Sequence, residues 1–476
     1  MGLALTHAPG AVAWSRSASA LWRRSLGVTY VLGGAEVVAL EGTAAAAWEL
    51  LAAPTTTDVL TGSLAELYGE ARATIAPEVA GLLERLAVEG LVTRSGLDSA
   101  PAAEELRTVT HDGSVDAVDP VAGLAGWGLP GCALRPPDPE VAGWPALLAS
   151  IRRERLTGLA VAAHLAGQLA LDADGVADLR AAHGDAMVTC LRLERRLLET
   201  VDLLEGAGVE PIVIKGPSVA HRHCADPSER PFGDIDLLIP DTQLDAAYAV
   251  LAAAGHRRRF PEPRPGFDRR FGKGAAFVAT DGLELDIHRT FASGPFGMTV
   301  DARDAHAAPA HFELAGRRLR ALAGAPDVVS LAMHAALGTR LPRLLNLRDV
   351  VQAAATTDAD AVVALATRWR VDGPVALALR HAIERFSLAT DAPLLAWASR
   401  HEMSAMQQRA LRAYIDPDRG FARQALAALP ALPTTRDRAA YVRALLLPDR
   451  SYVTPRDASR GRRWLRIVRT ASRARR

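Results

Sequence analysis

The sequence predicts an α+β protein: a winged-helix-like domain at the N-terminus, then a small mixed-sheet core that helical segments flank. Three observations support this fold class. A two-strand hairpin pattern precedes three helical patterns within residues 26–94. Short apolar strands alternate with helices between residues 211 and 290. The stretches before and after that segment carry apolar residues at helical spacing, which favours helices packed around a sheet.

The composition excludes several classes of protein. The chain has 476 residues, 49% of them hydrophobic, which is enough for two or three domains with their own cores. Its 55 basic and 54 acidic residues leave a net charge of +1, so the overall charge favours neither nucleic acid nor a membrane as partner. The three cysteines lie far apart, which argues against a disulfide framework, and no apolar run approaches the roughly twenty residues of a membrane span. We expect a cytoplasmic protein.

The first domain is expected over residues 23–98. Two β-branched runs surround Gly33 and Gly34, which indicates a two-residue hairpin. Segments with helical apolar spacing follow, namely "TAAAAWELLA", "TTDVLTGSLAELYG" and "TIAPEVAGLLERLAVEGLV". The residues "LVTR" after them offer a short strand. This order of elements is typical of a winged helix.

These residues resemble the PqqD-like family, whose domains bind the leader sequences of ribosomally made, modified peptides. The resemblance rests on the hairpin and on "AAAAWELLAAPTTTDVL" and "EVAGLLERLAVEGLV". It implies a leader-bearing peptide that adds as a strand to a sheet edge. DNA binding is the usual alternative for a winged helix, but the third helix carries Glu78, Glu84 and Glu89, a poor surface for phosphates. A domain that only packs against its neighbour is a further alternative.

The rest of the chain divides by composition. Residues 99–143 are rich in Gly, Pro, Ser and Asp and lack periodicity, so we expect a linker there. A second domain is expected over residues 144–325, with a helical lead-in at 144–207 and a sheet at 208–325. Residues 326–476 are expected to be helical and to end in a basic tail. A solvated terminus is the first interpretation of that tail, and contact with nucleic acid or an acidic peptide is the alternative.

The sheet of the second domain is predicted from alternating patterns. "PIVIKG" indicates a buried strand that ends at Gly216, and Pro217 begins a helix. "DIDLLIP" indicates a second strand, and the helix after it is expected to have Asp241 as its cap and to end at Gly255. "GAAFVAT" and "LELDIHRT" flank the Asp281–Gly282 turn of a predicted hairpin.

Acidic side chains share one face of these strands. Asp234 and Asp236 stand two residues apart, so their side chains point to the same face with Cα atoms roughly 6 to 7 Å apart. Two buried carboxylates so close repel unless a cation lies between or beside them, and oxygen ligands of this kind suit Mg²⁺ or Mn²⁺. On the hairpin, Asp286 shares a face with Glu284 and His288, and it completes a carboxylate triad if the two strands are neighbours. Three carboxylates can hold two metal ions for phosphoryl or nucleotidyl transfer.

Lys215 and Lys273 are the only lysines of the chain, and both lie in this segment. Because arginine is the default cation of the sequence, a retained lysine indicates a site that needs a compact charge. Lys215 and Gly216 stand between a strand and a helix, where backbone N–H groups and one ammonium can bind an anion. We therefore expect a triphosphate at this turn.

The motifs "VIKGPSVAHRH", "ERPFGDIDLLIP" and "ELDIHRT" together resemble the uncharacterised nucleotidyltransferases of the DNA polymerase β superfamily. The resemblance covers residues 145 to 355 and includes "MHAALGTRLPRLLNLRDVV". It implies metal-dependent transfer of a nucleoside monophosphate from a nucleoside triphosphate, expected to be ATP, to an acceptor hydroxyl, with release of pyrophosphate. Asp234 and Asp236 match the metal-binding pair, and Asp286 matches the third acid, which also takes up the acceptor's proton. All three are thus expected to be catalytic and to bind the metal.

Six residues are expected to contact the nucleotide: Lys215, Gly216, Ser218, Arg230, Lys273 and His288. Lys215 and Gly216 match the phosphate-contacting turn of the family. Arg230 matches the arginine before the aspartates, which pairs with phosphate or steadies the carboxylates. The Gly-Ser helix start common in the superfamily is replaced here by K-G-P-S farther upstream, so the place of the triphosphate and of Ser218 departs from the family's pattern.

The simplest combined function is modification of a ribosomally made peptide, whose leader the first domain holds while the second transfers a nucleotide. One alternative is a nucleotidyltransferase that acts on a small molecule. Another is a non-catalytic adaptor that keeps the fold and binds peptide only. The last is a glycosyltransferase whose D-x-D motif holds a nucleotide sugar. That enzyme needs a Rossmann-like half ahead of the motif, and the helical pattern before Pro211 does not supply one.

Overall fold

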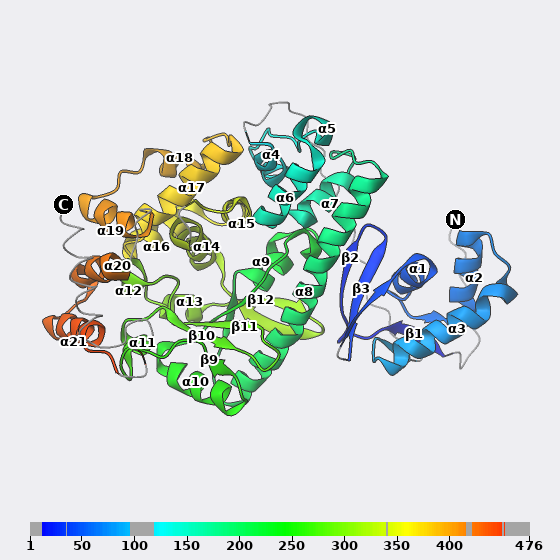
Figure 1. Cartoon of the computed structure of the whole chain (residues 1–476), viewed down its shortest axis with the longest axis horizontal. Helices are drawn as coiled ribbons and strands as arrows, with labels where there is room; N and C mark the ends of the chain where they lie inside the picture. The colour runs from blue at the N-terminus through cyan, green and yellow to red at the C-terminus, as the bar shows by residue number, and fades with distance from the viewer. Residues whose placement is uncertain are drawn as a thin grey trace.

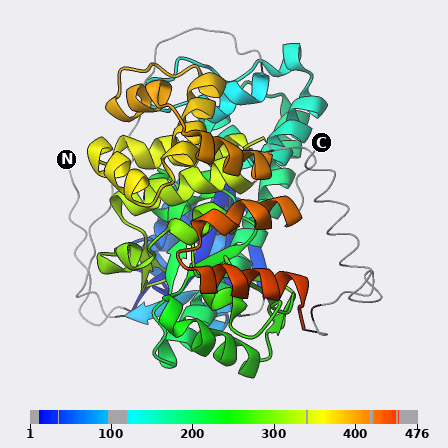
Figure 2. The ribbon, with the colours of Figure 1, turned by 90° about the vertical axis from the view of Figure 1, so that its left-hand side faces the viewer.

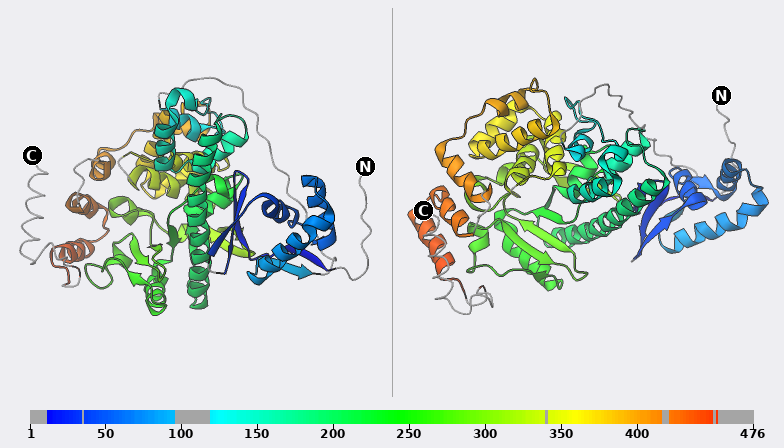
Figure 3. Two further views of the ribbon diagram at one scale, coloured as in Figure 1. Left: turned by 45° about the vertical axis from the view of Figure 1, so that its right-hand side comes forward. Right: turned by 45° about the horizontal axis from the view of Figure 1, so that its top comes forward.

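The computed structural model describes residues 12–34, 36–95, 119–338, 341–415, 421–449 and 452. A small N-terminal domain lies at one end of the long axis, and a larger body of sheet and helices makes up the rest (Figure 1). The long helix α8 (Ala173–Gly206) runs between the two, along the N-terminal strands that contact it (Figure 3). The fold is α+β, as the sequence predicts.

The N-terminal domain consists of two small antiparallel sheets and three helices. One sheet has the order β2 (Leu21–Ser25), β3 (Val28–Gly33), β4 (Glu36–Leu40). The other has the order β5 (Thr55–Thr56), β1 (Ala13–Arg16), β6 (Val92–Ser95). The helices are α1 (Gly42–Leu50), α2 (Thr57–Tyr68) and α3 (Arg72–Val88).

The predicted hairpin and three helices of this domain are confirmed. Trp14, Trp48 and Leu83 are buried in a core that the sheets and helices share. Gly33 ends β3 against the end of α3, where a Cβ would lie 2.9 Å from the Cβ of Glu89. A larger residue would therefore push the hairpin away from the helix. β2, which the sequence pattern does not reveal, widens the hairpin to three strands.

In the described residues, four helices lie between the N-terminal domain and α8: α4 (Pro120–Gly126), α5 (Pro139–Ala142), α6 (Trp144–Glu154) and α7 (Thr157–Leu165). The structure differs here from the linker expected over residues 99–143. Helix α4 is buried from Val121 to Gly126 and contacts α15 (Leu344–Ala355) and α17 (Asp372–Phe386). Since a fully buried helix of small apolar residues has no polar face, its sequence shows no helical period. Residues 96–118 of the expected linker lie outside the described residues.

Seven strands form the central mixed sheet. Their order is β12 (Ala310–Leu314), β13 (Arg317–Ala321), β7 (Ile212–Ile214), β8 (Ile235–Leu238), β11 (Glu284–His288), β10 (Gly274–Val278), β9 (Arg257–Arg258). β8 pairs with β11, and β13 with β7, in parallel; the other pairs are antiparallel. The predicted hairpin is the β10–β11 pair.

Short helices and turns connect these strands. α9 (Gly216–His223) follows β7 with Pro217 in its first turn, as predicted, and the 3₁₀ turn η1 (Pro227–Glu229) precedes β8. The cap predicted at Asp241 is wrong, because that residue lies in the 3₁₀ turn η2 (Asp241–Gln243) and α10 (Leu244–Ala253) begins without a side-chain cap. The other connections are α11 (Phe267–Arg270), α12 (Gly294–Thr299) and α13 (Arg303–Ala307).

The described residues of the C-terminal region from Gly324 to Leu446 form helices and connecting turns. Its remaining elements are α14 (Gly324–Gly338), α16 (Ala359–Arg368), α18 (Pro393–Arg400), α19 (Ala405–Ile415), α20 (Phe421–Ala428), η3 (Leu429–Ala431) and α21 (Thr435–Leu446). The last helices, in orange and red, lie in front of the central sheet in Figure 2. There Tyr441 of α21 stacks on Phe267 of α11. The expected basic tail lies outside the described residues.

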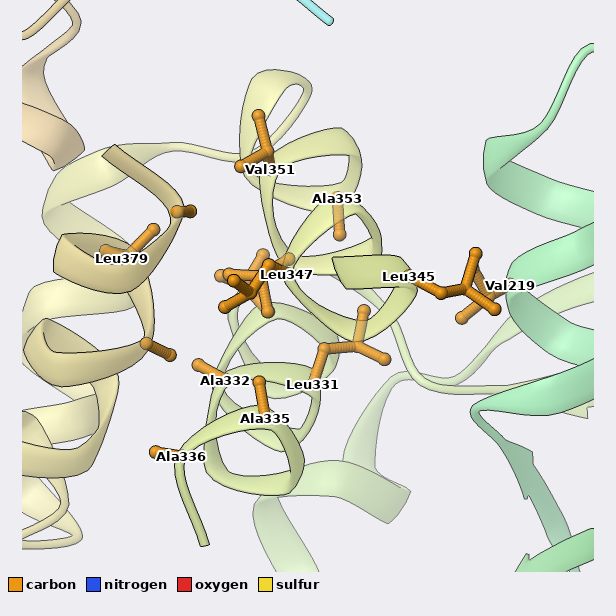
Figure 4. Packing of buried hydrophobic residues seen from close by; sticks show 14 of the residues in the cluster. Val219, Leu331, Ala332, Ala335, Ala336, Leu345, Leu347, Val351, Ala353 and Leu379 are labelled. Carbon is orange, nitrogen blue, oxygen red and sulfur yellow. The ribbon is translucent and has the colours of Figure 1, made fainter. Parts of the chain in front are cut away.

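The largest hydrophobic cluster joins α14, α15 and α17 to α9. Leu345 of α15 points toward Val219 of α9, and Ala332 of α14 faces the same cluster (Figure 4). This packing holds the start of α15 beside the helix that follows β7. Across the described ranges, no helix combines the length and apolarity that crossing a membrane requires.

Candidate active site

The register of two parallel strands brings two acids together. Asp236 of β8 lies directly opposite Asp286 of β11. Ile235 and Leu237, the neighbours of Asp236 along β8, are buried in the core on the other face. The strands predicted to be neighbours are therefore paired, and their period places both carboxylates on one face.

Asp236 is buried and has two partners. The Nζ of Lys215 donates to its Oδ1 at 2.7 Å, and the Nε2 of His288 lies 2.5 Å from the same oxygen. Burial alone would raise the pKa of Asp236, but the ammonium of Lys215 and the hydrogen bond to His288 hold that pKa well below its usual range. Burial, with the charges of Lys273 and Lys215, lowers the pKa of His288 to about 3, so the ring is neutral.

Asp286 is half-buried, and within the described ranges its carboxylate has no hydrogen bond or ion pair. Burial and the charge of Asp236 raise the pKa of Asp286. One ligand atom each from Asp236, Asp286 and His288 lie within 4.8 Å of one another, a donor set that fits a divalent cation. The excess negative charge at Asp286 is what such an ion would neutralise.

Asp234 does not join that cluster. β8 begins at Ile235, so Asp234 directly precedes the paired part of the strand. Burial and the charge of Asp236 raise the pKa of the half-buried Asp234. The structure thus brings together Asp236, Asp286 and His288, whereas the sequence predicts Asp234, Asp236 and Asp286.

The turn between β7 and α9 lies beside the acids. Lys215 has φ 56° and ψ −141°, a left-handed conformation that costs about 1 to 3 kcal/mol in a residue other than glycine. Gly216 begins α9, and the buried Ser218 follows in its first turn. The hydroxyl of Ser218 accepts a hydrogen bond from Arg222 at 3.4 Å. Strain of this kind clusters at functional sites, because the surrounding structure must maintain it.

Arg230 lies apart from the acid cluster and pairs with Asp349 of α15. Its Nε and Nη2 donate to the two carboxylate oxygens of Asp349 at 3.2 and 2.6 Å, and both residues are buried. Despite burial, the charge of Asp349 raises the pKa of Arg230. The arginine therefore ties the segment before β8 to α15, and a contact with phosphate remains a prediction.

Lys273 lies between the acid cluster and a cavity. Burial, then the charge of Lys215, lowers the pKa of Lys273, and the charges of Asp236 and Asp286 oppose that shift. The cavity has a volume of about 380 Å³. Besides Lys273, its lining comprises Phe291, Ala292, Ser293, Met333, His334, Leu337, Gly338, Tyr414 and Gln424.

Two of the residues around this site carry no local signal in the sequence. Asp349 stands in the motif "MHAALGTRLPRLLNLRDVV", but Tyr414 and Gln424 come from α19 and α20, far along the chain. Their position follows from the return of the C-terminal helices to the sheet. His334 has a helical pattern that favours packing, yet it lines the cavity, and burial with the charge of Lys215 moves its pKa well below the usual range.

Comparison with known proteins supports both resemblances. Residues 27–92 match the model of coenzyme PQQ synthesis protein D (PqqD). Residues 140–387, 248 of the 476, match the model of an uncharacterised nucleotidyltransferase family. That match spans α6 to α17 and so includes the whole acid cluster. No curated protein and no solved structure gives a significant match. The chain therefore belongs to the uncharacterised nucleotidyltransferase family and carries a PqqD domain at its N-terminus.

Proposed function

We propose that this protein transfers a nucleoside monophosphate from a nucleoside triphosphate, with ATP as the expected donor, to a hydroxyl group of a peptide. The observation that carries the proposal is the parallel register that sets Asp236 opposite Asp286, with Lys215 bonded to Asp236. The match of residues 140–387 to a nucleotidyltransferase family supports the same reaction class.

In the proposed reaction the acceptor oxygen forms a bond to the α-phosphorus, and the bond from that phosphorus to the bridging oxygen breaks. Pyrophosphate leaves with the bonding electrons, and the hydroxyl proton passes to Asp286. Asp236 and Asp286 would hold Mg²⁺ or Mn²⁺, which supplies positive charge to the phosphate oxygens. Lys215 and the first N–H groups of α9 bind phosphate, and His288 orients Asp236 through its 2.5 Å contact.

The cavity beside Lys273 supports a place for the acceptor. Its volume of about 380 Å³ is enough for a group the size of one amino-acid side chain. Phe291, Met333 and Leu337 offer apolar contacts, and Ser293 and Gln424 offer hydrogen bonds. Since the cavity borders Lys273, on which the charges of Asp236 and Asp286 act, a hydroxyl held there would lie near the acid cluster.

The N-terminal domain supports a peptide as the molecule that bears the hydroxyl. β4 is the edge of its sheet and, within the described ranges, pairs with β3 alone. Val38 of β4 is 39% exposed, so this edge is open to a further strand. The opposite edge strand, β2, contacts α8. A leader bound along β4 would raise the local concentration of its core peptide at the catalytic sheet.

Pyrophosphate release tests the proposal. Wild type and the Asp236→Asn and Asp286→Asn variants are incubated with each of the four nucleoside triphosphates and with Mg²⁺ or Mn²⁺. One set of reactions receives leader-bearing peptides, and a second receives small alcohols. We expect release that needs both carboxylates and a peptide, and mass spectrometry should find one nucleoside monophosphate added per peptide.

The remaining alternatives predict other results. Pyrophosphate release with small alcohols but not with peptides would indicate that the acceptor is a small molecule. Peptide binding without nucleotide turnover, unchanged in Asp236→Asn, would favour the non-catalytic adaptor. The glycosyltransferase alternative lacks support, because the described chain from Pro120 to Gly206 is helical and holds no Rossmann-like half before the D-x-D motif.

A further inference from the structure

Arg155 lies at the corner between α6 and α7 and reaches the segment that leads into β8. Its backbone is left-handed, with φ 61° and ψ 40°, and ends α6. Its guanidinium lies against Gly233, where a Cβ would be 2.9 Å from the Nη2 atom. Gly233 is exposed and directly precedes Asp234, so the guanidinium stands at an accessible position just before β8.

The corner is held in place from two sides. Glu154 Oε2 accepts a hydrogen bond of 2.9 Å from the backbone N–H of Leu344 at the start of α15. Gly158 packs on the carbonyl of Ser228, and a Cβ at this position would overlap that oxygen. The position of Arg155 is therefore fixed relative to α15 and to the strand that carries Asp236.

A second arginine stands next to the first. Arg343 is the cap residue of α15 and is exposed. Its neighbour in the chain, Leu344, is the residue that Glu154 holds. Burial and the nearby charge of Arg343 lower the pKa of Arg155, whereas the charge of Asp234 raises it. Arg155 thus lies within electrostatic reach of both Arg343 and Asp234.

Neither guanidinium has a hydrogen-bond or ion-pair partner within the described ranges. Three other cations nearby are already paired: Lys215 with Asp236, Arg230 with Asp349, and Arg222 with Asp327. A half-buried arginine without an acceptor retains its full capacity for two parallel hydrogen bonds to an oxyanion.

We propose that Arg155 and Arg343 bind the β- and γ-phosphates of the donor nucleotide, the part that leaves as pyrophosphate. This inference rests on the proposed function, since it assigns one end of the same site. A planar guanidinium suits phosphate because two of its N–H groups match two phosphate oxygens. The first turn of α9, where Val219 packs on Leu345 of α15, borders the same side of the proposed phosphate site (Figure 4).

The assignment also places the leaving pyrophosphate and the acceptor at opposite ends of the site. Asp234 and Arg155 lie at the end where β8 begins, whereas Lys273 adjoins Gly274, which pairs with His288 at the far end of β11. The cavity lies at that far end. In a displacement at phosphorus, the attacking and leaving oxygens lie on opposite sides. If pyrophosphate lies at Arg155, the acceptor therefore occupies the cavity on the opposite side.

Calorimetric titration of the full chain with inorganic pyrophosphate, ATP and AMP, each with Mg²⁺, tests the inference without turnover as the readout. Arg155→Ala should weaken pyrophosphate and ATP binding about tenfold or more, because a charge-assisted contact is lost. AMP, which lacks the β- and γ-phosphates, should bind within about twofold of wild type. Arg155→Lys keeps the charge but not the fork, and should recover binding only in part.

Two further variants sharpen the result. Gly233→Ala leaves the charge but displaces the guanidinium, so it should weaken pyrophosphate binding in the same direction. Arg152→Ala removes an equally charged, exposed residue of the same helix and should bind as wild type does. Thermal melting verifies that each variant is folded.

The outcomes separate the inference from the proposed function. If wild type binds ATP and pyrophosphate and the Arg155 variants bind both equally well, the inference is overturned and the proposed function stands. Equal losses for AMP and pyrophosphate would also overturn it, since the effect would not follow the leaving phosphates. If wild type binds no nucleotide and no pyrophosphate, the proposed function fails and the inference with it.

Discussion

Asp236 and Asp286 face each other, but their surroundings give them different energetic roles. Asp236 is buried and bonded to the ammonium of Lys215 and to His288. Asp286 is half-buried, and burial and repulsion from Asp236 raise its pKa. Removing the charge of Asp236 therefore breaks a buried ion pair, whereas removing the charge of Asp286 relieves a repulsion.

We predict that the two asparagine variants separate stability from activity. In metal-free buffer, Asp236→Asn should lower the free energy of unfolding by about 3 kcal/mol, since Lys215 then remains buried without its carboxylate. Asp286→Asn should keep the wild-type stability or raise it by less than about 1 kcal/mol. Both should lose nucleotide transfer. Urea unfolding measures the first effect, and equal destabilisation by both variants would contradict this account.

Residue patterns predict the identity of most of the candidate site. The period of two along a strand identifies Asp236 and Asp286, and the scarcity of lysine identifies Lys215 and Lys273. The same rule points to Asp234, which directly precedes β8, and its role stays a prediction. The rule cannot find Arg155, whose place next to Gly233 depends on how two distant segments pack.

At the scale of elements, the turn from β7 into α9 combines strain with function. Lys215 has a positive φ that glycine would adopt without cost, yet its side chain supplies the partner of Asp236. The surrounding contacts, including the packing of Val219 in the main core, hold the turn in this conformation.

Glycine and alanine at position 215 should reveal this strain. Both variants lose the ammonium, so both should lose nucleotide binding. Lys215→Gly should be more stable than Lys215→Ala by about 1 kcal/mol or more, because only glycine relieves the left-handed backbone. Chemical unfolding of the two proteins measures the difference. Equal stabilities would mean that the turn relaxes without cost.

Whole-molecule organisation depends on a polar interface between the N-terminal sheet and the catalytic body. Arg23 of β2 pairs with Glu194 of α8 and lies 3.0 Å from the Nε2 of His221 on α9. His221 in turn lies 2.8 Å from Glu194. The sheet whose β4 edge we propose as the peptide site is thereby joined to α9, which follows Lys215.

Removal of Arg23 should loosen this junction. Arg23→Ala leaves Glu194 buried without its cation and should destabilise the protein by about 3 kcal/mol. The adjacent Arg24, which pairs with Glu49 inside its own domain, is the matched control, and Arg24→Ala should cost less than about 1 kcal/mol. Unfolding curves give both values. Small-angle scattering should show a larger radius of gyration for Arg23→Ala alone.

His183 makes the same junction sensitive to acid. Its Nδ1 lies 2.8 Å from the hydroxyl of Ser25, and its Nε2 lies 3.0 Å from the carbonyl oxygen of Ser228. Burial lowers the pKa of His183, and the carbonyl of Ser228 and the charge of Asp226 only partly oppose that shift. The folded protein therefore binds this proton less readily than the unfolded chain does.

The sign of the pH effect follows from that shift. The contribution of the neutral His183 is complete above the unfolded pKa of about 6.5 and is lost as the pH falls below it. We predict that wild type loses more stability between pH 7.5 and 5.5 than His183→Gln does, by about 1 kcal/mol. Urea unfolding at the two pH values measures the difference. An identical loss in both proteins would show that other groups carry the acid sensitivity.

The sequence by itself determined the strands and helices around the site, the two domain types, and the acids and lysines proposed for the site. Each of these depends on local spacing, which fixes the faces of a strand or a turn without reference to the rest of the chain. Tertiary structure alone decided that β8 pairs with β11 so that Asp236 lies opposite Asp286, that α4 is buried, and that Arg230 pairs with Asp349. Those outcomes depend on contacts between segments that lie far apart in the chain, which no local period specifies.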